Sequence, residues 1–166
     1  MPATVTQTLP LTGYESTASC PVGTEYTDGI GNTYMYVQFK DAVAYAANQV
    51  LTWRSRSAFS VTNDISNSLI TYLMAGLALA VVPENYYGWM QTGGYNSAVK
   101  KDPNEDTWAA GDAVTPDASV DGVASVLAYA GTLAGFKTVI GCGAVAVAAS
   151  VDGSTDTVAC HVFCRR

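Results

Sequence analysis

The segment 76–94 constrains the fold of this chain more than any other. Its sequence is GLALAVVPENYYGWMQTGG. Leu77, Leu79 and Val81 occupy every second position, with alanine between them. Successive side chains of a β-strand point to opposite faces, so this period of two predicts a strand over 76–82 with one bulky and one small apolar face. The small face would let another layer of the fold, or another subunit, approach closely.

A second strand is predicted after a turn at Pro83-Glu84-Asn85. Over 86–91 the side chains again alternate: one side carries Tyr87, Trp89 and Gln91, and the other carries Tyr86, Gly88 and Met90. A glycine within a strand removes a side chain where something must pass near the backbone. We expect Thr92-Gly93-Gly94 to end this strand.

The first half of the chain predicts a hairpin over 22–38. Its turn contains Asp28-Gly29 and Gly31-Asn32, whose glycines and asparagine are expected to supply positive φ. Asp41 is expected to cap a short helix over 42–48, where small and apolar residues fall on one helical face.

The second half of the chain predicts further short strands joined by turns. They are expected at 112–115, 123–129, 137–142, 144–151 and 157–165. In 144–149 alanine alternates with valine as in 76–82, so a thin outer face is expected there too. About eight to ten short strands with turn signals between them indicate an antiparallel barrel or sandwich. The predicted fold is mainly β: a single antiparallel β-barrel, tulip-like or sandwich domain with one short helix and an extended N-terminal arm.

The N-terminal arm is assigned to residues 1–20 and the β-barrel domain to residues 21–166. The arm has no helical or strand period and is rich in Thr, Ser and Pro. Its apolar side chains could dock onto a partner, or the segment could be a frayed terminus. The candidate contact residues in the arm are Val5, Leu9, Leu11 and Tyr14.

Composition argues against several classes of function. The chain has 166 residues, 13% of them charged, with one histidine and a formal net charge of -6. A net negative charge is repelled by a phosphate backbone, so we expect no nucleic-acid partner. The longest apolar run is about half of what a spanning helix needs, so we expect no membrane partner. No secretory signal is recognisable, which favours free thiols over disulfides for the four cysteines.

Chemistry-bearing motifs are few. His161 lies between Cys160 and Cys164, but a strand would point it away from the face that the two thiols share, and zinc needs converging ligands. No GxSxG-like elbow precedes His161, and the acidic loop over 102–117 lacks the spacing of an EF-hand. A catalytic pair of carboxylates for glycoside hydrolysis stays an open alternative, because only the fold determines the distance between two acidic side chains. We expect no catalytic residue, no metal and no cofactor.

The order of motifs resembles the capsid decoration (cement) proteins of tailed bacteriophages. AGLALAVVPENYYGWMQTGG is similar to the pattern AGxAxxxIPxGYYGWVQxxG of those proteins. The early hairpin ending in TYMYVQ and the closing GDAVTPDASVDG and IGCGAVAVAAS occur in the same order. This chain departs from the pattern at Met90, in the turn 84–85, in the cysteine-bearing last strand and in an insertion over 100–108.

The resemblance implies a β-barrel bound in many copies to the outer surface of a phage capsid. It implies a non-enzymatic virion protein, made in the host bacterial cytoplasm, that stabilises the capsid by bridging neighbouring major capsid subunits. The expected partners are the major capsid protein and neighbouring copies of the chain, as a dimer or trimer. Tyr87 and Trp89 join the arm as contact candidates. The alternative is a glycan-binding module of a virion fibre or surface, with Tyr87, Trp89 and Trp108 stacking on sugars.

Overall fold

The fold is described from a computed structural model of the chain. It describes residues 10–40, 45–68, 73–103, 108–126, 144–147 and 157–164. The strands are β1 (Tyr14–Glu15), β2 (Glu25–Thr27), β3 (Thr33–Phe39), β4 (Val50–Ser55), β5 (Ser60–Thr62), β6 (Met74–Ala78), β7 (Tyr87–Lys100), β8 (Ala113–Pro116), β9 (Ala124–Val126), β10 (Ala144–Ala146) and β11 (Thr157–Phe163). One 3-10 turn, η1 (Ile65–Asn67), follows β5.

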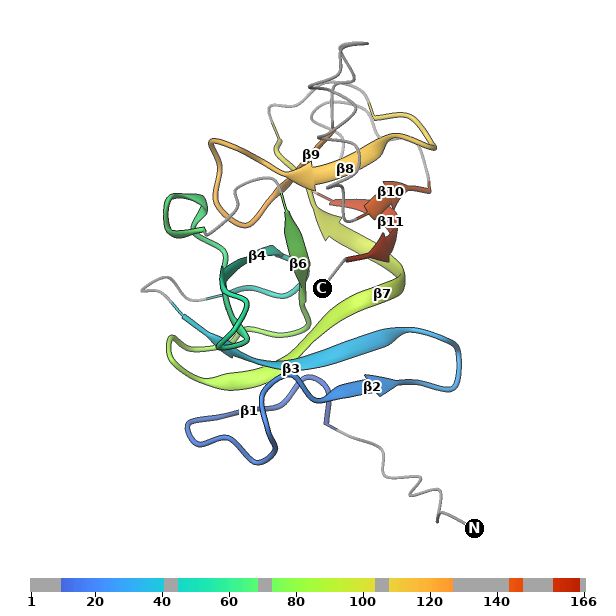
Figure 1. Cartoon of the computed structure of the whole chain (residues 1–166). Helices are drawn as coiled ribbons and strands as arrows, with labels where there is room; N and C mark the ends of the chain where they lie inside the picture. Colours follow the sequence, from blue (N-terminus) through green and yellow to red (C-terminus); the bar gives the residue numbers. More distant parts are fainter. Residues whose placement is uncertain are drawn as a thin grey trace.

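Five strands form a closed barrel, which confirms the predicted mainly β fold (Figure 1). The order is β3-β5-β4-β6-β7, and pairing of β3 with β7 closes the ring. Four of these pairings are antiparallel. The pairing of β3 with β5 is parallel, with Gln38 opposite Ser60, so the barrel is not antiparallel throughout.

The barrel interior is filled by side chains from alternate positions of its strands. On β3, Met35, Val37 and Phe39 are buried among the apolar side chains of the barrel core. Met90 of β7 joins the same core, while Tyr87 and Trp89 lie in a different cluster. The predicted two faces of the 86–91 strand are therefore confirmed.

β7 is longer than the sequence predicted, because Thr92-Gly93-Gly94 does not end it. The strand continues to Lys100, and Figure 1 shows it running from the barrel to the group of strands β8 to β11. Gly94 has φ +94°. A Cβ added at Gly93 would lie 2.5 Å from Oγ1 of Thr33. The two glycines therefore allow β3 to pass close to β7 at a point where β7 bends but keeps its pairing.

Beyond the barrel the same sheet continues from the second half of β7, in the order β7-β11-β10-β8-β9. An isolated parallel bridge from Lys101 to Ala124 brings the end of β7 against β9. A second buried cluster fills this region and contains Trp108, Val158 and Cys160. β7 thus contributes to both halves of the molecule.

The small faces of the alternating segments point inward. Ala144 and Ala146 are buried in the same cluster as Trp108, whereas Val147 is 40% exposed. On β6 both faces are buried, and a Cβ on Gly76 would lie 2.6 Å from the carbonyl oxygen of Gln91. The expectation of a thin outer face is wrong here: the small residues admit neighbouring parts of the same chain.

The predicted helix over 42–48 is not seen in its described part. Residues 45–49 form loop and turn, Asn48 has φ 65°, and Val50 begins β4. Residues 41–44 lie outside the described residues. The predicted hairpin over 22–38 is confirmed as β2 and β3, although Gly31 has positive φ in its turn and Asn32 does not.

The other strand predictions are confirmed in part. The strand predicted over 76–82 is β6, which begins at Met74 and ends at Ala78, so residues 79–82 lie in the β6–β7 connection. Strands β8 and β11 match the predictions for 112–115 and 157–165, while β9 and β10 occupy parts of 123–129 and 144–151. The predicted strand over 137–142 lies outside the described residues.

Candidate functional site

Five aromatic side chains form a continuous layer on the outside of the barrel. They come from the outer faces of β2, β3 and β7, where side chains alternate with those of the barrel core. Tyr36 is opposite Trp89 in the β3–β7 register, which places the rings next to one another. We call this layer the aromatic face; it consists of Tyr26, Tyr34, Tyr36, Tyr87 and Trp89.

The rings of the aromatic face pack in specific geometries. Tyr36 lies edge-on to Trp89, with 5.4 Å between the ring centroids, and stacks on Tyr87 at 6.3 Å. Tyr26 stacks on Tyr34 at 6.0 Å and lies edge-on to Trp89 at 6.4 Å. Such pairs add about 0.5–1.5 kcal/mol each beyond the burial of their area. The layer therefore stabilises the barrel from outside.

The hydroxyl groups of the buried tyrosines are paired. The hydroxyl of Tyr34 donates to Oδ2 of Asp28 at 2.9 Å, and that of Tyr36 donates to Oε1 of Glu15 at 3.1 Å. The amide of Ser19 donates to the hydroxyl oxygen of Tyr36 at 3.3 Å. Burial is the main cause that raises the pKa of both tyrosines.

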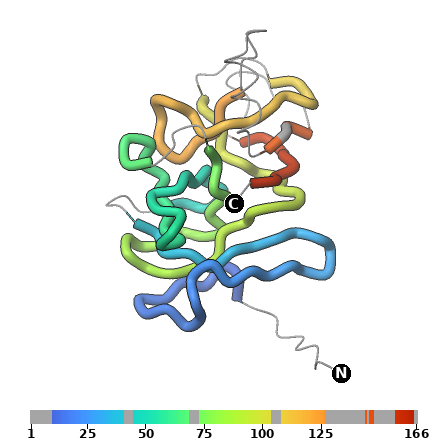
Figure 2. Tube along the Cα trace, viewed as in Figure 1, coloured from blue at the N-terminus to red at the C-terminus, as the bar shows by residue number. Residues whose placement is uncertain are grey.

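Residues 10–20 run beneath the barrel, as the dark blue tube shows in Figure 2, and Leu11 and Cys20 of this segment pack against the aromatic face. Within this segment β1 pairs with β7, with Tyr14 opposite Gly88. A Cβ on Gly88 would lie 3.3 Å from the carbonyl oxygen of Gly13, so the glycine permits the close approach that its position in the strand predicted. The described part of the predicted arm therefore folds back on its own barrel.

A pocket of 530 Å³ lies between this segment and the barrel. It is lined by Pro10, Gly13, Tyr14, Glu15, Ser19, Cys20 and Trp89. Within the lining Glu15 carries the one charged side chain, and Ser19 donates a hydrogen bond to it.

The predicted contact residues differ in exposure and surroundings. Leu11 packs against the aromatic face. Tyr14 is 48% exposed and lies edge-on to Tyr86, with 5.7 Å between the centroids. Tyr87 is half-buried, and Trp89 is only 8% exposed because its own chain encloses it, so Trp89 offers little surface to a partner. Val5 and Leu9 lie outside the described residues.

The sequence analysis missed a set of exposed apolar side chains around the β2–β3 turn and β11. Ile30 is 86% exposed, Tyr95 49% and Phe163 44%. The rings of Tyr95 and His161 lie 5.8 Å apart, edge to face. A signal was available in the alternation of 157–163, which places His161 and Phe163 opposite the buried Cys160.

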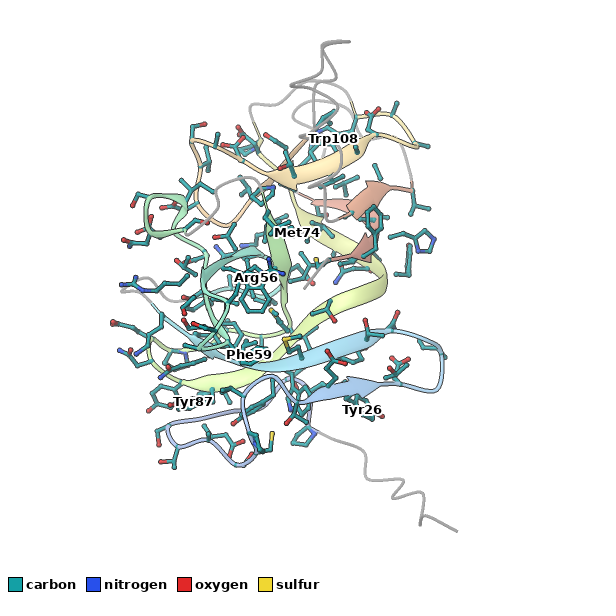
Figure 3. The ribbon with its side chains drawn as sticks, in the orientation of Figure 1. Tyr26, Arg56, Phe59, Met74, Tyr87 and Trp108 are labelled. Carbon is teal, nitrogen blue, oxygen red and sulfur yellow. The ribbon has the colours of Figure 1, made fainter. Side chains whose placement is uncertain are left out.

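The groups with potential chemistry are spread over the described part of the chain. Within it, no three His, Cys, Asp or Glu side chains gather in a way that could hold a metal ion. Cys20 and Cys160 are free thiols, and burial raises the pKa of Cys160 to about 12. Trp108 is fully buried and lies at the opposite end of the molecule from Tyr26 and Tyr87 (Figure 3).

The aromatic face and the exposed apolar side chains can bind a partner by apolar and aromatic contact. No helix among the described residues is long and apolar enough to cross a membrane. No protein-family model matches the chain, and comparisons with curated proteins and with solved structures found no match.

Proposed function

We propose that this protein is a non-enzymatic virion protein that binds the outer surface of a phage capsid and bridges neighbouring major capsid subunits. The observation that supports this most is the placement of large exposed apolar side chains around a closed barrel. Isolated exposed apolar residues are ordinary, but groups of them mark interaction surfaces. The resemblance of 75–94 to the decoration-protein pattern names the partner.

A bridging protein needs at least two contact surfaces. Tyr14 on β1 lies edge-on to Tyr86 of the β6–β7 connection, in which Val81 is 60% exposed, and we assign Tyr14 and Val81 to the first surface. Ile30 in the β2–β3 turn and Phe163 at the end of β11 belong to the second. Figure 1 shows the β6–β7 connection and the β2–β3 turn on opposite sides of the barrel. The two groups can therefore contact two different subunits at once.

The energy needed from each contact is modest. A standard interface buries about 800 Å² on each partner. Full burial of one large apolar side chain contributes about 1.5–3 kcal/mol. A capsid lattice repeats the same contact many times, and linked contacts add avidity without new interactions. A few exposed side chains on each side of the barrel are therefore sufficient.

The function is tested by adding purified protein to capsids of the encoding phage that lack it. We expect saturable binding in co-sedimentation, with a copy number set by the lattice, and a higher temperature of DNA release. Absence of saturable binding, or only a handful of copies per particle, would contradict the proposal.

The predicted contact through the N-terminal arm is tested by deletion. Deleting residues 2–18 would remove β1 and Leu11 and uncover the aromatic face, so lost binding could reflect lost folding. Deleting residues 2–9 leaves β1 and its pairing with β7 in place. If the arm makes the contact, this shorter deletion abolishes capsid binding while the barrel keeps its melting temperature. Unchanged binding would place the contact elsewhere on the barrel.

The exposure of the three predicted stacking rings does not support the glycan-binding alternative. Sugar stacking requires an accessible aromatic surface. Trp108 is 0% exposed, and Trp89 is packed against Tyr26 and Tyr36. Of the three predicted stacking residues, only Tyr87 keeps part of its surface accessible.

A further inference from the structure

The turn between β2 and β3 presents one large apolar side chain to solvent. Ile30 is 86% exposed, more than any other large hydrophobic residue that the structure describes. The backbone around it is closed by two hydrogen bonds, from the amide of Asp28 to the carbonyl of Asn32 at 3.0 Å and from the amide of Gly31 to the carbonyl of Asp28 at 3.2 Å. Burial within the chain does not explain an isoleucine at this position.

The carboxylate of Asp28 holds the turn in one conformation. Its Oδ1 accepts from the amides of Ile30 at 3.0 Å and Asn32 at 2.9 Å. Its Oδ2 accepts from the side-chain amide of Asn32 at 3.0 Å and from the hydroxyl of Tyr34 at 2.9 Å. The Asn32 side chain in turn accepts from the amide of Tyr95 at 3.0 Å, which ties the turn to β7. The backbone at Ile30 is therefore held in one conformation before any partner arrives.

Glycines flank Ile30 on both sides. A Cβ on Gly29 or Gly31 would meet no atom within 4 Å. Gly31 has φ +93°, which accounts for glycine there, but Gly29 is not among the positive-φ residues. Neither a steric clash nor a positive φ within this chain requires glycine at position 29. The result is a single apolar side chain that projects from a stretch of bare backbone.

We propose that Ile30 is a preformed anchor that inserts into a concave apolar pocket on the major capsid subunit. This inference rests on the proposed function and adds the residue and the shape of the contact. The bare backbone on either side lets the rim of such a pocket close around the isoleucine. An ordered turn also lowers the entropy lost on binding.

The chemistry of the turn favours a protein pocket over other partners. Isoleucine has no aromatic ring or hydrogen-bonding group for a sugar. The formal net charge of -6 opposes nucleic acid and anionic membranes. Tyr95 and Phe163 are exposed on the strands next to the turn, so a protein that receives Ile30 can also contact apolar surface around it.

The test compares capsid binding of the wild type with that of Ile30→Ala, Ile30→Val and Gly29→Val. Ile30→Ala removes about three carbon atoms from the contact, so we expect its affinity to fall about 10- to 100-fold. Ile30→Val, the matched control, keeps most of the side chain and most of the affinity. Gly29→Val should also weaken binding by blocking the rim. All three variants should melt at the wild-type temperature, because position 30 is exposed and position 29 is open.

The outcomes separate the two proposals. If the wild type binds capsids and Ile30→Ala binds equally well, the anchor is refuted and the proposed function stands. If the wild type does not bind capsids, both are refuted. Binding to phosphatidylcholine vesicles that Ile30→Ala abolishes would make the turn a membrane contact and would also overturn the anchor.

Discussion

The substitution Gly94→Ala tests the bend at which β7 leaves the barrel. Gly94 has φ +94°, where an L-residue is strained by about 1–3 kcal/mol. A Cβ there would overlap Oδ1 of Asn32 and lie 2.8 Å from its Cα. Asn32 would have to move, and its 3.0 Å hydrogen bond from the amide of Tyr95 would be lost at a cost of about 0.5–1.5 kcal/mol. The total expected loss of unfolding free energy is about 1.5–4.5 kcal/mol.

Gly111→Ala is the matched control for this prediction. Gly111 has φ +96°, but a Cβ there would meet no atom within 4 Å. The control therefore carries the backbone strain without the overlap. Urea titrations followed by tryptophan fluorescence measure both variants, because Trp53, Trp89 and Trp108 are buried. Gly94→Ala should lose about 1 kcal/mol or more beyond Gly111→Ala. Equal losses would refute the close passage of the hairpin over β7.

Three further predictions concern buried polar groups. Tyr36→Phe removes the hydroxyl that pairs with Glu15 and Ser19 and should lower the unfolding free energy by about 1 kcal/mol, measured in urea. Burial raises the pKa of Cys160 from 9.0 to about 12, so the stability of the wild type should fall as the pH rises from 9.0 toward 12. The stability of Cys160→Ala should fall less over the same range. An equal dependence of stability on pH in the two proteins would contradict the burial of this thiol. Burial opposes ionisation of Asp117, but hydrogen bonds from Ser125 and Ser119 outweigh it and lower its pKa below 3.8. The stability of the wild type should therefore drop as the pH falls through that region, and the stability of Asp117→Asn should drop less. Parallel acid unfolding curves for the two proteins would refute this.

Alternation in the sequence predicted the two faces of β7 in the barrel wall, but it did not define β4 or β5. The period of two in 86–91 correctly separated Met90, which faces the core, from Tyr87 and Trp89, which face outward. The hairpin was predictable because a glycine-containing turn lies between two segments rich in β-branched and aromatic residues. Both signals depend only on residues that are close together in the sequence, and both predicted features are present in the structure.

Features that depend on distant parts of the chain were not predictable. Thr92-Gly93-Gly94 has the composition of a turn, but pairing with β3 and β11 makes it a bend within one strand. Whether alanines face inward depends on what fills the space opposite; Ala144 and Ala146 share their cluster with the bulky Trp108. The parallel pairing of β3 with β5 likewise has no local signal.

The candidate contact surface was only partly predictable for the same reason. An aromatic strand indicates either core or interface, and Trp89 became enclosed because residues 10–20 fold over it. Ile30 was overlooked because a single apolar residue in a turn carries no periodic signal. Its exposure and the hydrogen bonds around it appear only once the turn is built.

A cryo-electron microscopy reconstruction of the intact particle tests the central claim most directly. The account predicts density for this barrel on the outer capsid surface, in copies that follow the lattice, with each copy touching two neighbouring capsid subunits and the β2–β3 turn seated in an apolar pocket. A particle whose outer surface carries no such density, or a barrel that contacts a single subunit, would contradict it.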